Sequence, residues 1–441
     1  MKKRILAAVI AAVFAVLNVA SALPVFALNE STTRYPTPEG YNDHDYQKLV
    51  AFLEQTDDEG VKNGEKLSEN YDPNDPETWG TYVGGQRFNW VESDGELRIQ
   101  IIYGESCGLC GLLDVSGCTA LEHLECDSNN LTTLDVSGCT ALEDLDCDYN
   151  NLTALDVSSN TALTSLDCDS SNLTLLDVSN NTALQTLYCY YNNLTSLDVS
   201  GCTALTYLEC SNNNLTGLDV SNNTALTSLY CNNNNLTTLD VSNNAALMDL
   251  CCDDNSLTEL DVSNNTTLYE LSCYNNNLTE LDLSHNPYLP LDYVKSEGDG
   301  TIGYVYYGSS PWHRYLKLYA FQNSGADFLG WYNEDGELIV SANDCHGYDN
   351  EFEYRFEDED IDGIEGTVFI AKFTEAEPIP GDADGDGELT FNDVTVLYYY
   401  LLNGDMTGMT PESLAGADLN NDGVISVSDI TLMFNLLLGG S

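Results

Sequence analysis

The stretch that decides the fold runs from Leu131 to Asn151 and reads LTTLDVSGCTALEDLDCDYNN. It contains a short apolar pattern twice, first as LxxLxV and then as LxxLxC, and each half ends in a turn with Asn, Ser or Gly. Leu145 and Cys147 fall on one face of the extended chain and Asp146 on the other, as a half-buried strand requires. Because such units follow one another from about residue 101 to residue 286, the sequence predicts a stack of strands in which each unit covers the next.

Fifteen cysteines would indicate a disulfide framework if the chain were exported. Eight of them instead recur every 21 residues, at Cys126, Cys147, Cys168, Cys189, Cys210, Cys231, Cys252 and Cys273. This period indicates that cysteine serves as a small buried hydrophobe of the repeat. Cys118, Cys139 and Cys202 occupy a second repeat position that is Asn in other units, such as Asn160.

The array resembles the leucine-rich repeat family, LxxLxLxxNxL, in its bacterial form with two nested half-repeats. The resemblance implies a mainly β solenoid of 21-residue repeats with two strands per repeat. The helical spacing of Tyr46, Leu49, Val50 and Leu53 within residues 43–55 predicts a helix, which together with the aromatic residues up to Trp90 resembles the cap that often precedes such repeats. We expect the turn asparagines, including Asn150, to form a hydrogen-bonded ladder inside the solenoid.

The outward positions around each repeated cysteine form a face that changes from acidic to tyrosine-rich along the array. We predict this face to be the ligand-binding surface, because rows of tyrosine commonly recognise proteins and sugar rings. The alternative is an ordinary solvated face, since Tyr also has a high strand propensity. The candidate residues are Asp144, Asp146, Asp148, Asp167, Asp169, Tyr188, Tyr190, Tyr207, Tyr230 and Tyr274.

The other half-repeat keeps an aspartate in every unit, from Asp114 to Asp282, and a serine follows two residues later. In a parallel stack these carboxylates would lie about 4.8 Å apart and repel one another. Either hydrogen bonds from nearby serines or bound cations must offset this repulsion. We favour local hydrogen bonding, because the Asp-Val-Ser sequence recurs.

The chain ends and the charge indicate an exported protein. Lys2, Lys3 and Arg4 precede an apolar run and small-residue cleavage sites, which predicts a signal peptide over residues 1–27, with an uncleaved anchor as the alternative. Fourteen basic residues stand against 71 acidic ones, giving a formal net charge of -57. This charge excludes nucleic acid and anionic membrane surfaces as partners, and we expect no membrane insertion.

The repeat period is lost after Pro287, and four β-prone stretches follow, over residues 315–322, 328–332, 351–356 and 368–373. The run FLGWYNEDGELIV and the closing FIAKF resemble the small β-rich modules that follow leucine-rich repeats in internalin-type surface proteins. The resemblance implies a spacer or adhesion element.

Two C-terminal loops, DADGDGELTFND and DLNNDGVISVSD, have oxygen ligands at positions 1, 3, 5 and 12 and glycine at position 6. A loop that bends at glycine around a seven-coordinate calcium needs this spacing. The sequence therefore predicts two Ca²⁺ sites. The expected ligands are Asp382, Asp384, Asp386, the carbonyl of Glu388 and Asp393, and then Asp418, Asn420, Asp422, the carbonyl of Val424 and Asp429.

A predicted helix follows each loop, over residues 392–402 and 427–438, and this duplicated loop–helix unit resembles a dockerin, the module that binds the cohesins of a cellulosome scaffoldin. The resemblance implies cohesin contacts at Phe391, Asn392, Val427 and Ser428. Because Phe391 and Asn392 differ from Val427 and Ser428, we predict one preferred binding orientation.

The predicted organisation is a signal peptide (1–27), a cap (28–100), the solenoid (101–292), the β module (293–375), a linker (376–380) and the dockerin (381–441). The favoured function is a non-catalytic secreted cellulosome component, held at the cell surface by its scaffold, whose repeats bind protein or polysaccharide. The alternative is an internalin-like adhesin tethered by its dockerin. We expect no enzyme, because no catalytic motif is present and solvated acids on the repeat face would keep ordinary pKa values.

Overall fold

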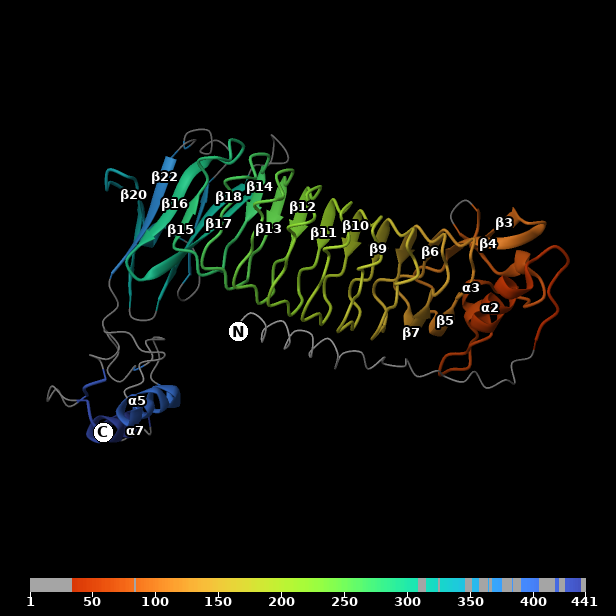
Figure 1. Ribbon diagram of the computed structural model, residues 1–441, viewed down its shortest axis with the longest axis horizontal. Helices are drawn as coiled ribbons and strands as arrows, with labels where there is room; N and C mark the ends of the chain where they lie inside the picture. Colours follow the sequence, from red (N-terminus) through yellow and green to blue (C-terminus); the bar gives the residue numbers. More distant parts are fainter. Residues whose placement is uncertain are drawn as a thin grey trace, which may run out of the picture. The chain divides into compact units, whose positions relative to one another are not determined.

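The computed structural model describes residues 34–82, 85–307, 315–323, 326–345, 351–356, 364, 367–374, 383, 390–403, 417–419 and 425–437. The predicted signal peptide lies outside these residues. Figure 1 shows the repeat turns side by side, from the first repeats in orange to the last in green. No helix among the described residues is long and apolar enough to cross a membrane.

The N-terminal part begins with helix α2 (Asp43–Leu53), followed by α3 (Asn63–Leu67) and the 3-10 turn η1 (Pro76–Thr78). The Asn42 side chain caps α2 by accepting a hydrogen bond from the Asp45 amide, as is common for Asn before a first helical turn. The predicted apolar face, Tyr46 to Leu53, is buried. Trp79 packs against it, with its ring centroid 5.4 Å from that of Tyr46. These residues close the first end of the solenoid.

The cysteine strands build one continuous sheet. The strands from the cap hairpin to the last repeat are β3 (Phe88–Ser93), β4 (Glu96–Tyr103), β6 (His123–Glu125), β8 (Asp144–Asp146), β9 (Ser165–Asp167), β10 (Thr186–Tyr188), β11 (Tyr207–Glu209), β12 (Ser228–Tyr230), β13 (Asp249–Cys251) and β14 (Glu270–Ser272). From β4 to β14 the pairing is parallel and in register, so each residue lies beside its equivalent in the next repeat. A short hairpin of β1 (Thr81–Tyr82) and β2 (Gly85–Gln86) precedes β3.

The prediction of a second strand in every repeat is wrong for most described repeats. A second ladder forms between β5 (Cys110–Asp114) and β7 (Asn130–Asp135), and further along the array only as an isolated bridge between Asp177 and Asp198. The last repeat contributes β15 (Glu280–Asp282), which pairs with the following module. Each aspartate of this half-repeat accepts a hydrogen bond from the backbone amide of the serine two residues on, both where the ladder forms and where it does not. The ladder forms next to the cap, where the Gln55 side chain bonds both backbone groups of Leu112 in β5.

The predicted asparagine ladder is present. The Asn150 amide nitrogen donates to the carbonyls of Cys126, Cys147 and Asp148, and its oxygen accepts from the Leu131 amide. Equivalent bonds recur at Asn129, Asn192, Asn213, Asn234, Asn255 and Asn276. The eight repeated cysteines are free thiols, and each residue is at most 1% exposed, as expected for a small buried hydrophobe.

The module after the repeats continues the solenoid sheet. Its strands are β16 (Leu291–Glu297), β17 (Gly300–Tyr307), β18 (Tyr315–Gln322), β19 (Phe328–Tyr332), β20 (Leu338–Ser341), β21 (Glu351–Phe356) and β22 (Thr367–Phe373), with the 3-10 turn η2 (Ala342–Asp344) after β20. β17 pairs antiparallel with β14, and β18 and β21 follow it in the same sheet. A second sheet has the order β15-β16-β22-β19-β20. The four strands predicted here agree with the structure to within one residue.

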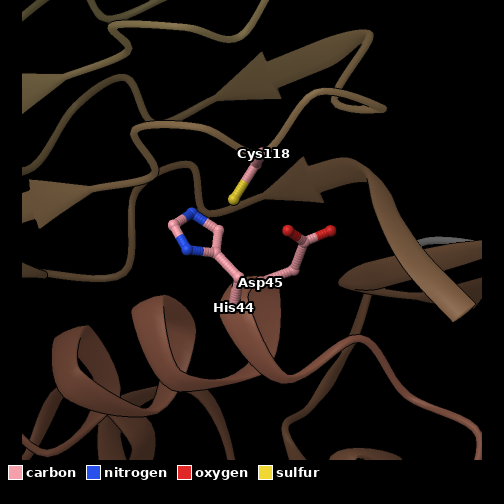
Figure 2. Close-up of side chains that lie close together, drawn as sticks. All are labelled: His44, Asp45 and Cys118. Carbon is pink, nitrogen blue, oxygen red and sulfur yellow. The ribbon is translucent and has the colours of Figure 1, made fainter.

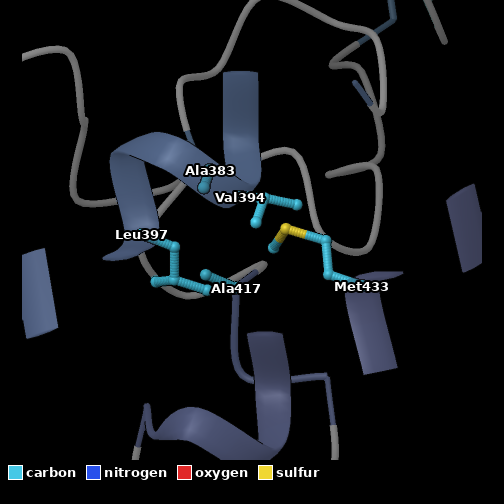
Figure 3. Close-up of a cluster of buried hydrophobic side chains, with 5 residues drawn as sticks. All are labelled: Ala383, Val394, Leu397, Ala417 and Met433. Atoms are coloured by element: carbon cyan, nitrogen blue, oxygen red, sulfur yellow. The ribbon is translucent and has the colours of Figure 1, made fainter. Parts of the chain in front are cut away.

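Helices α5 (Phe391–Asn403) and α7 (Val427–Leu437) lie near the C-terminus and confirm the two predicted helices to within a residue at each end. Figure 3 shows the apolar cluster that joins them, which consists of Ala383, Val394, Leu397, Ala417 and Met433. This cluster fixes the two helices against the described parts of the loop segments.

Candidate functional sites

The acidic end of the cysteine-strand face lies on β8, β9 and the residues that follow them. Oxygens of Asp146, Asp148 and Asp167 lie within 4.8 Å of one another, because the parallel register stacks equivalent residues side by side. Burial, reinforced by the charges of neighbouring carboxylates, raises the pKa of Asp146 and of Asp148 to about 7, and that of Asp167 to about 6. The pKa of Asp169 rises to about 9 for the same reasons. Asp144 stands at the edge of this group, where its carboxylate lies 3.8 Å from His123 Nδ1.

These raised pKa values correct one of our premises. We expected the acids of this face to be solvated and to keep ordinary pKa values. The expectation is wrong because the carboxylates lie between neighbouring strands, and Asp169 is only 2% exposed. Asp169 is held there by a hydrogen bond of 2.6 Å from the Tyr190 amide to its Oδ1. Part of this face is therefore protonated near neutral pH.

The tyrosines follow the acids along the array. Tyr188, Tyr207 and Tyr230 form a row across β10, β11 and β12, with successive ring centroids 4.8 and 5.5 Å apart. Tyr207 lies diagonally between the other two because it is placed two residues earlier in its strand. The structure thus brings together three of the predicted face tyrosines as one aromatic surface.

Tyr274 does not join that row. Its ring stacks on Tyr319 of β18, at a centroid distance of 5.2 Å, and a side chain at Gly303 would come within 2.8 Å of the Tyr274 Cα. Tyr274 is therefore packed against the β module, and the free aromatic surface ends before it.

Two further tyrosines, which sequence reasoning missed, stand at the turn after the cysteine strand. Tyr149 and Tyr191 are 54% and 58% exposed, and both have left-handed backbone conformations, with φ of 44° and 49°. Other repeats place Asn212, Asn233 and Asn275 at this position, and asparagine adopts this conformation more readily than tyrosine. The Tyr190 ring lies 5.3 Å from that of Tyr191, and its hydroxyl interacts with Tyr149. The signal in the sequence was the replacement of a turn asparagine by an exposed aromatic residue.

The aspartate row of the other half-repeat is explained by local hydrogen bonding, as predicted. From Asp114 to Asp282, each aspartate Oδ1 accepts from the amide of the serine two residues on, at about 3 Å. These serine bonds lower the pKa of Asp198, Asp219, Asp240, Asp261 and Asp282. The serine bonds therefore favour the charged form of these five aspartates.

The C-terminal loops place two predicted calcium ligands in equivalent positions. Asp393 Oδ2 accepts from the Thr390 amide at 2.6 Å, and Asp429 Oδ2 accepts from the Ser426 amide at 2.9 Å. Both aspartates are completely buried, at the start of α5 and α7. A buried carboxylate requires hydrogen bonds or a cation, so both residues fit the calcium prediction. Asp418 is described and partly buried, whereas Asp382, Asp384, Asp386, Glu388, Asn420, Asp422 and Val424 lie outside the described residues.

The predicted cohesin contacts start the same two helices. Phe391 is 56% exposed and Val427 is 71% exposed. The Phe391 ring lies 5.9 Å from that of Phe434, which is also exposed and which the sequence analysis did not name. The side chains of Asn392 and Ser428 lie outside the described residues. The two helix starts thus expose apolar side chains of different size.

Comparisons with known protein families match two parts of the chain. Residues 380–438 match the family model of the dockerin type I domain, and residues 182–223 match that of leucine-rich repeats, in two copies. Among curated proteins, none matches this chain.

Several solved structures are similar. The functional domain of InlJ from Listeria monocytogenes, which includes a cysteine ladder, is 26% identical, with 60% of this chain and 78% of that chain covered and a TM-score of 0.34. Internalin C2 from Listeria monocytogenes is 21% identical, covering 42% of this chain and 82% of that chain, with a TM-score of 0.36. YopM from Yersinia pestis, a leucine-rich effector protein, is 27% identical, covering 38% and 50%, with a TM-score of 0.32.

Proposed function

We propose that this chain, which contains leucine-rich repeats and a dockerin type I domain as its sequence predicted, is a non-catalytic secreted component of a cellulosome or related scaffold complex. The dockerin match over residues 380–438 carries this proposal, because a dockerin implies a cohesin partner. Both kinds of domain are typically interaction modules. The repeats then present the tyrosine-rich face to a protein or polysaccharide ligand.

The attachment is calcium-dependent in this proposal. Asp393 and Asp429 would each supply carboxylate oxygen to a Ca²⁺, together with the loop ligands named from the sequence. Calcium bound there would compensate the negative charge of the two buried carboxylates. The exposed Phe391 and Val427 side chains would then contact the cohesin.

A capture experiment tests this attachment. The full chain is passed over immobilised type I cohesins in calcium and, separately, in EDTA. We expect retention in calcium and release in EDTA, and an Asp393→Ala, Asp429→Ala double variant should not be retained. Retention that is equal in both buffers, or absent for every cohesin tried, would contradict the proposal.

The second candidate is an internalin-like adhesin that uses the dockerin only as a tether. Tyr149 and Tyr191 are exposed and have left-handed backbone conformations, which asparagine would adopt with less strain. The presence of tyrosine at both positions therefore favours a ligand that binds the repeats. Glycan arrays and pull-downs from host or neighbouring cells, each with the full chain, separate the two. Binding to plant cell-wall polysaccharide favours the first function, and capture of a cell-surface protein favours the second.

The acids with raised pKa values call for one control. Release of reducing sugar is measured with the full chain and with an Asp146→Asn, Asp167→Asn variant. We expect none from either protein, and sustained release that the variant abolishes would show that the chain is an enzyme.

A further inference from the structure

A cluster of three different donor groups lies where the cap helix meets the first repeat. His44 and Asp45 belong to the first turn of α2, and Cys118 belongs to the first repeat turn. A nitrogen, an oxygen and a sulfur of these residues lie within 4.8 Å of one another. Figure 2 shows the His44 ring and the Asp45 carboxylate both directed toward the Cys118 sulfur.

Asp45 has one carboxylate oxygen without a hydrogen bond. The residue is completely buried, and its Oδ2 accepts from the Ile99 amide at 3.2 Å and lies 3.4 Å from Arg98 Nε. Its Oδ1 is also buried and makes no hydrogen bond of ordinary geometry among the described residues, and the donor group close to the carboxylate is the Cys118 thiol. An unpaired buried carboxylate oxygen is costly, and a metal ion is one of the groups that can compensate it.

Cys118 differs from its equivalents in what its sulfur faces. Cys139 and Cys202 donate to the carbonyls of Val115 and Val178 in the preceding repeats, at 3.1 and 3.4 Å. Cys118 begins this row, so its sulfur lies beside the cap helix and Asp45. A metal bound here would take the place of the proton on the Cys118 sulfur.

His44 is the third of the three donor residues, and it lies on the side of the cluster that faces solvent. The residue is exposed, and its Nε2 lies 2.7 Å from the carbonyl oxygen of Ser116. Gly117 makes room for the ring, since a Cβ there would lie 2.9 Å from Nε2, and its φ of 76° also suits glycine. A metal at Nε2 would displace the Ser116 carbonyl from that nitrogen, so the ring must turn when the metal binds, and the remaining ring proton would sit on Nδ1.

We propose that His44, Asp45 and Cys118 bind a Zn²⁺ ion that links the cap helix to the first repeat. A mixed nitrogen, oxygen and sulfur set suits zinc, whereas calcium and magnesium prefer oxygen alone. Binding releases the thiol proton of Cys118, so one thiolate, one carboxylate and a neutral imidazole balance the ion. The two nearby cationic side chains do not occupy the Oδ1 atom of Asp45. Lys48 is paired with Asp114, and Arg98 lies against Oδ2 of Asp45. Water fills the fourth position on the exposed side.

Zinc titration of the reduced full chain tests the proposal, with calcium in excess so that the dockerin loops are occupied. Cys118→Asn is the decisive variant, because asparagine fills the same repeat position at Asn160 and Asn181 and should preserve the fold. Cys139→Asn is the matched control, one repeat further from α2. We expect one equivalent of zinc in the unaltered chain and in Cys139→Asn, none in Cys118→Asn, and at least about tenfold weaker binding in His44→Ala.

Cobalt supplies a second readout that does not depend on stability. Co²⁺ in place of zinc should give a thiolate charge-transfer band in the near ultraviolet, which Cys118→Asn removes and Cys139→Asn keeps. Melting curves should shift upward with zinc only in the proteins that retain Cys118. No uptake by the unaltered chain, or the same uptake and the same band in Cys118→Asn, would overturn the proposal.

Discussion

The asparagine ladder has one gap, at Ser171, and filling it should stabilise the solenoid. Ser171 occupies the position of Asn150 and Asn192 in the neighbouring repeats. It is buried, at 6% exposure, and its Oγ makes no hydrogen bond among the described residues. Asn150 makes four bonds from the same position, three through its nitrogen and one through its oxygen. The repeat around Ser171 therefore lacks a set of bonds that its neighbours have.

The magnitude follows from those four bonds. A buried hydrogen bond contributes a net value of about 1 kcal/mol, and immobilising the longer asparagine side chain costs about 1 kcal/mol. The partners available to Asn at position 171 are the Leu152 amide and the carbonyls of Cys147, Cys168 and Asp169, by analogy with Asn150. We expect Ser171→Asn to raise the free energy of unfolding by about 1 kcal/mol, because the carbonyls of Cys147 and Cys168 are already bound by Asn150 and Asn192 and gain less from a second donor.

Denaturant unfolding of the reduced full chain, in calcium, measures this change. Asn150→Ser is the matched reverse variant, and it should lower the free energy of unfolding by a similar amount. Hydrogen exchange localises the effect, since the Leu152 amide should exchange more slowly in Ser171→Asn. If Asn150→Ser destabilises the chain but Ser171→Asn leaves both stability and Leu152 exchange unchanged, the reasoning from repeat equivalence is refuted.

Three further predictions concern the two binding surfaces and the acids between the strands. Alanine at Phe391 and Asn392 should weaken cohesin binding by a different factor from alanine at Val427 and Ser428, as measured by calorimetry, and equal mild losses would contradict a single preferred orientation. Tyr191→Asn should stabilise the chain by about 0.5–1 kcal/mol in melting experiments, because asparagine tolerates the left-handed backbone, while weakening capture of the repeat ligand; unchanged capture would exclude Tyr191 from the binding surface. In the folded chain the pKa of Asp169 is about 9, well above its unfolded value of about 4. Protonated Asp169 therefore stabilises the folded state at low pH, and this stabilisation is lost as the pH rises from about 4 to about 9. Asp169→Asn should therefore raise the melting temperature at pH 8 and leave it nearly unchanged at pH 4, whereas Asp198→Asn, at a residue whose pKa is lowered, should not stabilise the chain at pH 8.

Much of the fold was predictable because it is local and periodic. The spacing of Leu and Cys within each unit fixes which side chains are buried, and the strands at β18, β19 and β21 follow from short aromatic runs bounded by turns. The serine two residues after each aspartate was also sufficient to predict how the carboxylate row is stabilised. Each of these conclusions depends on residues only a few positions apart.

The features that the sequence did not predict arise from contacts between segments. The second strand is missing from most described repeats, and its ladder forms next to the cap, where Gln55 bonds both backbone groups of Leu112. The pKa values of Asp146 and Asp169 rise because neighbouring strands bury them, which no single repeat reveals. The meeting of Asp45 with Cys118 depends on how α2 packs against the first repeat, and nothing in the spacing of those residues indicates it.

The antiparallel pairing of β17 with β14 has a practical consequence for anyone who divides this protein into fragments. A fragment that stops at Asn286 would leave the edge of β14 unpaired and expose the ring of Tyr274. Other copies of the fragment could then pair with this open sheet edge and aggregate. A fragment that continues through Phe373 keeps β17 paired with the edge of β14, so repeat fragments intended to be soluble should end there.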